Sequence, residues 1–397
     1  MSRAFILLLD SFGLGAAPDA AAFGDAGADT FGHIAAWAFA NGEPLQLPNL
    51  ERLGLAAAGH LAGGKWAKGF ARRFDFGAAY GSACERSTGK DTQSGHWEIA
   101  GAPVDFEWGY FPHTVPAFPL ELTAALQAQS GVPGFLGDCH ASGTEIIKQL
   151  GDQHVASGKP IIYTSSDSVL QIAAHEEAFG LERLYALCEA AFKLVEPYNI
   201  GRIIARPFVG AAGNYKRTSN RRDYAVAPPA PTLLDHVKDA GGEVVALGKV
   251  SDIFAGHGVT RKVKGDGNMA LFDALLKVVD EAGEDALAFV NFVDFDQSYG
   301  HRRDIAGYAA ALRELDARLP EFIARMRPDD LAVITADHGC DPTWAGTDHT
   351  REQIPMLFFG PGVTPRALGV SSCFSDIGQT LASHLGVAPL AHGSNLL

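Results

Sequence analysis

The strongest constraint on the fold is an alternation of two hydrophobic patterns along the chain. Compact apolar runs, which predict buried strands, lie at 4–9, 161–164, 202–205, 243–247, 287–293, 331–335 and 356–359. Segments with apolar residues three or four positions apart, which predict amphipathic helices, lie at 47–55, 180–195, 231–241, 268–283 and 308–326. This alternation is typical of an α/β protein with a mostly parallel central sheet flanked by helices.

Two proline-rich stretches, at 104–119 and 223–232, interrupt the alternation. Such stretches commonly mark domain boundaries. The block between them has strand and helix patterns of its own. We therefore expect a core domain made of 1–103 and 223–397, with a smaller α/β cap domain inserted at 104–222.

The composition excludes several classes of protein. The chain has 32 Lys and Arg against 46 Asp and Glu, a net charge of −14, which argues against a nucleic-acid partner because such a partner needs a concentrated basic face. The first apolar run is too short for a secretory signal, and no stretch approaches the roughly 20 apolar residues that cross a bilayer. Five widely spaced cysteines without a CxxC pair favour a reducing, cytoplasmic location.

Acidic residues follow three of the predicted strands. Asp10 ends the first apolar run, Asp296 follows the fifth, and Asp337 follows the sixth. Ligands of open α/β sheets bind beyond the carboxyl ends of the strands, so these positions are candidates for a site. Taken singly, an Asp after a strand more often caps a helix or begins a turn.

Three histidines lie in the same segments: His301, His338 and His349. With the three carboxylates they supply enough ligands for two metal ions with three protein ligands each, and mixed oxygen and nitrogen ligands favour manganese or zinc. The alternative for each residue alone is a hydrogen-bonded loop histidine. Spacing by itself is not sufficient, because Asp252 and His257 repeat the separation of Asp296 and His301 without a similar setting.

Two further segments have polar turns. GLGAAP after the first strand lacks the third glycine of a dinucleotide-binding loop, so a Rossmann site is not predicted. STGKDTQSGHWEIAG contains Thr92 and Ser94, and a hydroxyl activated by a metal ion can accept a phosphoryl group. The alternative for this second segment is a simple turn.

Long strings of the sequence resemble the phosphopentomutase family of the alkaline phosphatase superfamily. They extend over essentially the whole chain: MSRAFILLLDSFGLGAAPDA, FGDAGADT, GKDTQSGHWE, YTSSDSVLQIAAHEE, ARPF, NRRDYA, GKVSDIF, VDFDQSYGHRRD and TADHGCDPTWAGTDHTRE. The resemblance implies a core domain with a dinuclear manganese site, although other divalent ions are possible, and a cap inserted into that core. Ser94 and Cys340 stand where threonine and asparagine are common in the family pattern.

The resemblance also implies roles for particular residues. Thr92 of GKDT corresponds to the phosphorylated threonine. Asp10, Asp337 and His338 would hold one ion, and Asp296, His301 and His349 the other. The implied substrate contacts are Ser165, Asp167, Val169, Arg202 and Lys249, with Arg206 as a second phosphate contact.

The implied reaction interconverts α-D-ribose 1-phosphate and ribose 5-phosphate, and the 2-deoxyribose phosphates, through a phosphothreonine and a 1,5-bisphosphate. A sugar bisphosphate would be the activator, pentose phosphates the only partners, and a monomer is favoured. Three alternatives remain open: a phosphohydrolase of the same superfamily, a metal-dependent phosphoglycerate mutase, and a metal-binding relative without activity. The phosphoglycerate mutase would need a serine nucleophile motif, which this chain lacks.

Overall fold

The computed structural model describes residues 2–73, 75–165 and 168–397. The chain divides into two compact units. Unit 1 runs to Phe106 and resumes at Ala227, and unit 2 extends from Glu107 to Val226. The limits that we expected from the sequence for the inserted domain, 104–222, remain a prediction.

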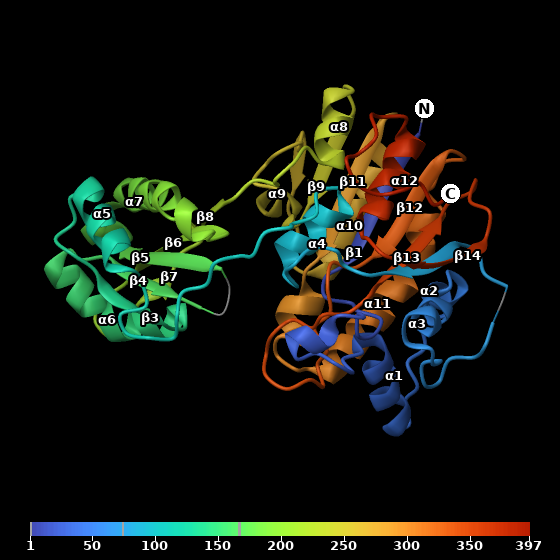
Figure 1. Ribbon diagram of the computed structural model, residues 1–397, viewed down its shortest axis with the longest axis horizontal. Coiled ribbons are helices and arrows are strands. Elements are labelled where there is room, and N and C mark those ends of the chain that lie inside the picture. Colours follow the sequence, from blue (N-terminus) through green and yellow to red (C-terminus); the bar gives the residue numbers. More distant parts are fainter. Residues whose placement is uncertain (1, 74, 166–167) are drawn as a thin grey trace. The chain divides into compact units, whose positions relative to one another are not determined.

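Unit 1 is built on an eight-stranded sheet with the order β10-β9-β11-β1-β12-β13-β2-β14 (Figure 1). Its strands are β1 (Arg3–Leu9), β2 (Ala79–Ala83), β9 (Glu243–Leu247), β10 (Arg261–Val263), β11 (Ala286–Phe292), β12 (Asp330–Thr335), β13 (Ile354–Phe359) and β14 (Arg366–Ser371). Only β13 runs antiparallel to its neighbours. The predicted α/β class with a mostly parallel sheet is confirmed.

The central strands β1, β11 and β12 are buried along their whole length. Strands covered on both faces read as continuous apolar runs, which is why the sequence revealed them. Two groups of helices pack on this sheet. One is α4 (Thr92–Ile99), α8 (Leu233–Asp239), α9 (Val250–Ile253) and α12 (Ser375–Leu385); the other is α1 (Thr30–Ala40), α2 (Pro48–Arg52), α3 (Leu55–Gly63), α10 (Asn268–Glu281) and α11 (Ile305–Ile323).

Unit 2 has a mixed six-stranded sheet with the order β3-β4-β5-β6-β7, in which β8 also pairs with β6. The strands are β3 (Leu136–His140), β4 (Ile161–Thr164), β5 (Val169–His175), β6 (Arg202–Val209), β7 (Lys216–Arg217) and β8 (Arg222–Ala225). The helices are α5 (Leu120–Ser130), α6 (Gly143–Ser157) and α7 (Leu181–Leu194). Two apolar clusters, one beneath α5 and α7 and one beneath α6, form its core.

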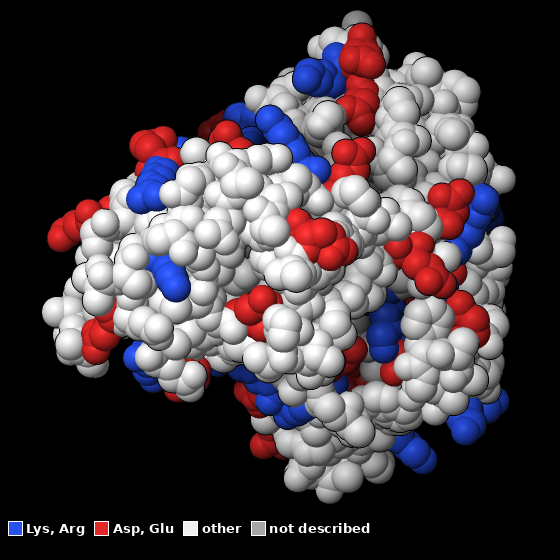
Figure 2. Space-filling model, turned by 60° about the vertical axis from the view of Figure 1, so that its left-hand side comes forward, with Lys and Arg blue, Asp and Glu red and all other residues white. Residues whose placement is uncertain are grey.

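Among the described residues, no helix is both long enough and apolar enough to cross a membrane. Acidic and basic side chains are interspersed over the face that Figure 2 shows.

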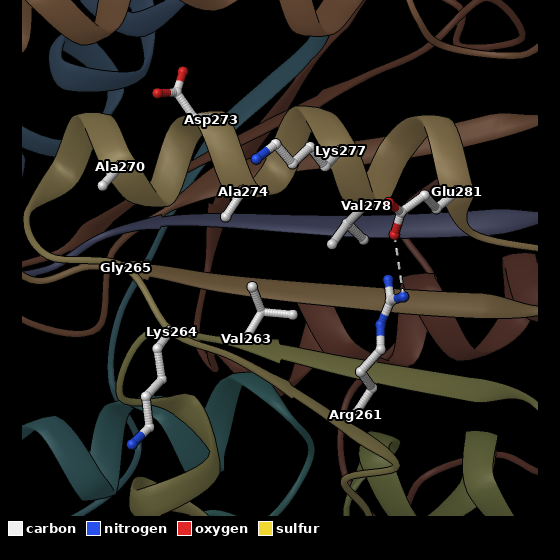
Figure 3. A pocket seen from close by; sticks show the side chains of 10 residues that line it. All are labelled: Arg261, Val263, Lys264, Gly265, Ala270, Asp273, Ala274, Lys277, Val278 and Glu281. Carbon is white, nitrogen blue, oxygen red and sulfur yellow. Dashed lines mark hydrogen bonds and ion pairs between the residues drawn. The ribbon is translucent and has the colours of Figure 1, made fainter.

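A pocket of about 410 Å³ lies between the edge strand β10 and the helix α10 (Figure 3). Ala274 and Val278 of α10 face Val263 of β10, and Arg261 Nη1 reaches Glu281 Oε2 at 3.3 Å. Of the described residues that line it, none is a site residue predicted from the sequence. The candidate site of unit 1 therefore lies elsewhere.

A buried ion pair joins the beginnings of β1 and β12. Arg3 is 1% exposed, and its Nε and Nη2 donate to the two carboxylate oxygens of Asp330 at 2.9 and 2.6 Å. Its Nη1 donates to the Val279 carbonyl at 2.6 Å. Such two-pronged pairs fix geometry, and removing one partner leaves a buried charge uncompensated.

We expect Arg3→Met to lower the free energy of unfolding of unit 1 by about 3–5 kcal/mol, because Asp330 would be left buried without its partner. Urea denaturation measures this. The double variant Arg3→Met/Asp330→Leu should recover most of the loss. As a control, Arg325→Met removes the exposed pair with Asp280 and should cost only about 0–1 kcal/mol. Equal losses for Arg3→Met and Arg325→Met would contradict this account.

Candidate metal centre

The order of the central strands brings the three predicted carboxylates together. β1 lies between β11 and β12 and is parallel to both, so the carboxyl ends of all three strands meet at one edge. Asp10 follows β1 directly, Asp337 follows β12, and Asp296 lies in the π-helical turn η4 (Phe295–Gly300) after β11. One ligand atom from each of Asp10, Asp337 and His338 falls within a 4.8 Å cluster, and so does one from each of Asp296, His338 and His349.

Each of the three predicted histidines has its Nδ1 against a backbone carbonyl. The acceptors for His301, His338 and His349 are the oxygens of Thr347 at 2.6 Å, Gly339 at 3.0 Å and Lys90 at 3.1 Å. A carbonyl can only accept, so the proton of each neutral ring belongs on Nδ1. The lone pair is then on Nε2, which is the arrangement of metal-binding histidines.

The Nε2 atoms point at the carboxylates. His338 Nε2 lies 3.3 Å from Asp337 Oδ2 and 3.7 Å from Asp10 Oδ1. His301 and His349 place their Nε2 atoms 3.3 and 3.4 Å from the two oxygens of Asp296, and 3.1 Å from each other. Two facing lone pairs repel unless a proton or a cation lies between them.

Three buried carboxylate oxygens provide a test of whether a cation fits. Among the described residues, Asp10 Oδ1, Asp296 Oδ1 and Asp337 Oδ2 have no hydrogen-bond partner. Buried charged atoms without partners are costly, and native proteins usually satisfy them. Each of these oxygens faces a histidine Nε2, so together they form an oxygen and nitrogen donor set that fits divalent cations.

The pKa values of the clustered carboxylates and imidazoles reflect how closely these groups lie to one another and how deeply they are buried. Burial raises the pKa of Asp10 well above its usual value, and the negative charges of Asp337 and Asp296 raise it further. Burial opposes ionisation of Asp296 as well, but His349 and His301 hold its pKa well below the usual range. In turn, against the effect of burial, Asp296 raises the pKa of His349 to about 10. Burial lowers the pKa of His338 to about 4. The carboxylate of Asp296 and the imidazole of His349 therefore stabilise each other's charged forms.

The predicted nucleophile lies at the same edge of the sheet. Thr92 is the first residue of α4, and its Oγ1 lies 3.2 Å from His338 Nε2. Asp91 caps the helix by accepting from the Gln93 and Ser94 backbone N–H groups, both at 3.0 Å. Ser94 Oγ donates to Asp91 Oδ2 at 2.9 Å and is buried. The Ser94 hydroxyl thus belongs to the cap, whereas the Thr92 hydroxyl faces the cluster.

Two supporting residues were not predicted from the sequence. Asn291 Nδ2 donates to Asp10 Oδ2 at 2.9 Å and to His96 Nε2 at 3.0 Å. His96 Nδ1 lies 2.8 Å from the Thr92 carbonyl and 3.1 Å from Asp337 Oδ2. An amide nitrogen can only donate, so His96 carries its proton on Nδ1. Asn291 could have been predicted from the sequence, because it is the one polar residue in the apolar strand ALAFVNF.

Backbone geometry adds one more contact. Ser11 has a φ of 69°, which is uncommon for a residue with a side chain, and its N–H donates to Asp337 Oδ1 at 3.0 Å. Such left-handed residues concentrate at functional sites, where the surrounding structure sustains them. The turn after β1 thus directs both the Asp10 carboxylate and the Ser11 N–H into the cluster.

The predicted substrate contacts occur in both units. In unit 2, Val169 at the start of β5 pairs with Arg202 at the start of β6. Arg202 Nη1 lies 3.5 Å from Asp223 Oδ2, and its buried Nε has no hydrogen-bond partner among the described residues. Arg206 lies four residues further along β6. Its Nε donates to Gln171 Oε1 at 3.0 Å, and burial lowers its pKa.

The remaining predicted contacts are Ser165, Asp167 and Lys249. Ser165 is half-buried after β4, and Asp167 lies outside the described residues. Lys249 is in unit 1, where its Nζ donates to Gln297 at 3.2 Å and its charge partly offsets the rise in the pKa of Asp10. The structure thus brings Thr92 and the six predicted ligands together in unit 1 and pairs Val169 with Arg202 in unit 2.

The chain is similar to known proteins over almost its whole length. The sequence matches the model of the metalloenzyme superfamily over residues 2–389. It is 59% identical to a phosphopentomutase from Sinorhizobium medicae, with 100% of both chains covered, and 59% identical to one from Chromohalobacter salexigens, with 100% of this chain and 96% of the relative covered. Among solved structures, phosphoglycerate mutase from Leishmania mexicana has a TM-score of 0.49 at 12% identity, covering 99% of this chain and 97% of that one.

The superfamily match defines the class, a metalloenzyme, and the structure has a candidate metal site at the carboxyl edge of its mostly parallel sheet. Within that class the chain belongs to the phosphopentomutase family, and it is an isomerase of the mutase type.

We expect Asn291→Leu to weaken binding of Mn²⁺ by about 10- to 100-fold, the usual effect of removing a hydrogen-bond partner of a metal ligand. Asp10 and His96 would each lose their donor. Calorimetric titration of the metal-free protein measures the affinity. Ser82→Ala is the matched control, because it removes a buried hydrogen bond to Gln353 elsewhere in unit 1 and should leave the affinity unchanged. Equal affinities for Asn291→Leu and the unaltered chain would show that Asn291 does not support the site.

Proposed function

We propose that the chain interconverts α-D-ribose 1-phosphate and D-ribose 5-phosphate, and the corresponding 2-deoxyribose phosphates, through a phosphothreonine at Thr92. The observation that carries this proposal is the Thr92 hydroxyl, which lies 3.2 Å from His338 Nε2 beside the cluster of carboxylates and imidazoles. The identity with relatives named phosphopentomutase supports the choice of substrate.

The position of Thr92 suits a phosphorylated side chain. It begins α4, and the amino-terminal end of a helix stabilises negative charge by about 0.3–1 kcal/mol. The Asp91 cap fixes the first turn. His96 hydrogen-bonds the Thr92 carbonyl one turn later and stacks on Phe289, with ring centroids 5.4 Å apart. The nucleophile is therefore held on a rigid element.

In the proposed reaction, phospho-Thr92 gives its phosphoryl group to the free hydroxyl of a bound pentose monophosphate. The bond from phosphorus to Thr92 Oγ1 breaks, a bond to the sugar oxygen forms, and the hydroxyl proton replaces the phosphoryl group on Thr92. The resulting 1,5-bisphosphate reorients and transfers its other phosphoryl group to the Thr92 hydroxyl, which releases the isomerised monophosphate. A sugar bisphosphate would serve as activator by phosphorylating Thr92 anew after occasional hydrolysis.

Two Mn²⁺ ions, or other divalent cations, would neutralise the charge of the phosphoryl oxygens when bound by the two ligand sets. The first set is Asp10, Asp337 and His338. The second is Asp296, His301 and His349. The chain's own contribution is orientation, because the Nδ1 hydrogen bonds to backbone carbonyls keep each imidazole turned with Nε2 inward.

We further propose that Ser165, Val169 and Arg202 contact the sugar phosphate, with Lys249 and Arg206 as additional contacts and Asp167 as a candidate outside the described residues. The buried Nε of Arg202 has no hydrogen-bond partner among the described residues, which supports this role because a guanidinium with an unused donor is suited to bind phosphate. A cytoplasmic monomer is our proposal for its state in the cell.

The first test incubates the manganese-loaded protein with ribose 5-phosphate and a sugar bisphosphate, and follows ribose 1-phosphate and inorganic phosphate. We expect ribose 1-phosphate with little phosphate release. Thr92→Ala should reduce this turnover by more than about 10⁴-fold, the scale of losing a nucleophile, while metal binding is weakened but not abolished.

Ser94→Ala is the matched control, since its hydroxyl belongs to the helix cap. Mass spectrometry should find one added phosphoryl group in the unaltered protein and in Ser94→Ala, and none in Thr92→Ala. Phosphate release without ribose 1-phosphate would instead favour a phosphohydrolase. Full turnover by Thr92→Ala would move the nucleophile elsewhere.

A further inference from the structure

A buried thiol lies beside the second ligand set. Cys340 follows His338 and Gly339, is 0% exposed, and contributes its Sγ to a 4.8 Å cluster with ligand atoms of Asp296 and His301. A Cβ added at Gly300 would be 3.0 Å from this sulfur, so the sulfur packs directly on the backbone that precedes His301. The carboxylate of Asp296 carries a buried oxygen, Oδ1, that has no hydrogen-bond partner among the described residues.

A guanidinium lies against this sulfur. Arg303 Nη1 donates to Cys340 Sγ at 3.3 Å. Among the described residues, Arg303 also donates to backbone carbonyl oxygens, those of Gly300, Asp341, Gly346 and Asp348. Arg303 thus links the sulfur to the backbone of Gly346 and Asp348 and holds it in place.

We propose that Asp296, His301 and Cys340 form a mixed oxygen, nitrogen and sulfur site for a thiophilic divalent cation such as Cd²⁺ or Zn²⁺. This donor set differs from the one proposed for manganese by exchanging the His349 imidazole for a thiolate. Soft thiolate ligands select zinc-like ions, whereas oxygen and imidazole ligands suit manganese. Binding transfers the thiol proton to solvent and forms a bond from sulfur to the metal.

The consequence is that one position can be held by either of two ligand sets. His301 and Asp296 are common to both, and His349 and Cys340 approach Asp296 from separate parts of the segment that follows β12. A thiophilic cation bound through Cys340 would thus exclude manganese from the second position. The inference rests on the proposed function in its use of Asp296 and His301 as ligands, but its test does not depend on turnover.

The experiment titrates the metal-free full-length protein with Cd²⁺ and follows the ultraviolet charge-transfer absorption of a thiolate-cadmium bond. The unaltered chain should show this band, saturating with one thiolate. Cys340→Ser should lose the band and bind Cd²⁺ at least about tenfold more weakly, the lower end of what the loss of a partner at a metal site costs. Its affinity for Mn²⁺ should be unchanged.

Cys84→Ser is the matched control, because Cys84 is half-buried in unit 1 and lies outside the ligand clusters. It should keep the band. Thermal melts identify variants that do not fold, and Cys340→Ala replaces Cys340→Ser if the serine variant fails. A band of equal intensity in either Cys340 variant, or no band in the unaltered chain, would overturn the proposal. Loss of mutase turnover with Mn²⁺ alone would count against the proposed function and leave the thiol result standing.

Discussion

Mutual repulsion of three buried carboxylates is the constraint around which unit 1 is organised. Because β11, β1 and β12 are adjacent and parallel, Asp296, Asp10 and Asp337 end at one place with little water to separate their charges. Burial and the charges of the neighbouring carboxylates raise the pKa of Asp10, which reflects the cost of placing these charges together. A cluster of this kind persists only where the neighbouring structure compensates it.

The compensation comes from many directions. Imidazoles face each carboxylate, the Asn291 amide donates to Asp10, and the Ser11 N–H donates to Asp337 from a left-handed turn. None of these groups carries a negative charge, so none adds to the repulsion. Among the described residues, one oxygen of each of the three side chains still has no hydrogen-bond partner, and these are the positions at which divalent cations would fit. The strand order brings the three carboxylates together, and the left-handed turn at Ser11 and the orientation of the histidines offset the resulting repulsion.

Much of this was predictable from the sequence because buried parallel strands are continuous apolar runs, and the polar residue after each run is easy to locate. Asp10 and Asp337 were predicted as ligands in this way, and the α/β class was confirmed. Hydrogen bonds between distant segments leave no such pattern, so His96 was missed although it lies one helical turn after Thr92. The left-handed conformation of Ser11 follows from a tertiary contact, and nothing in the residue type indicates it. Half-exposed strands such as β3 and β8 were missed because they lack a continuous apolar run.

The insertion of unit 2 has a consequence for the order in which the protein is made. Asp10 and the Asn291 that supports it are 281 residues apart, with all of unit 2 between them. At about 5–20 residues per second, a ribosome needs on the order of tens of seconds to pass from one to the other. Throughout that interval, in which the whole of unit 2 is synthesised, β1 is an apolar strand without either of its parallel neighbours. The nascent chain must keep β1 from aggregating until its partners emerge, so the metal centre is among the last features of the molecule to form.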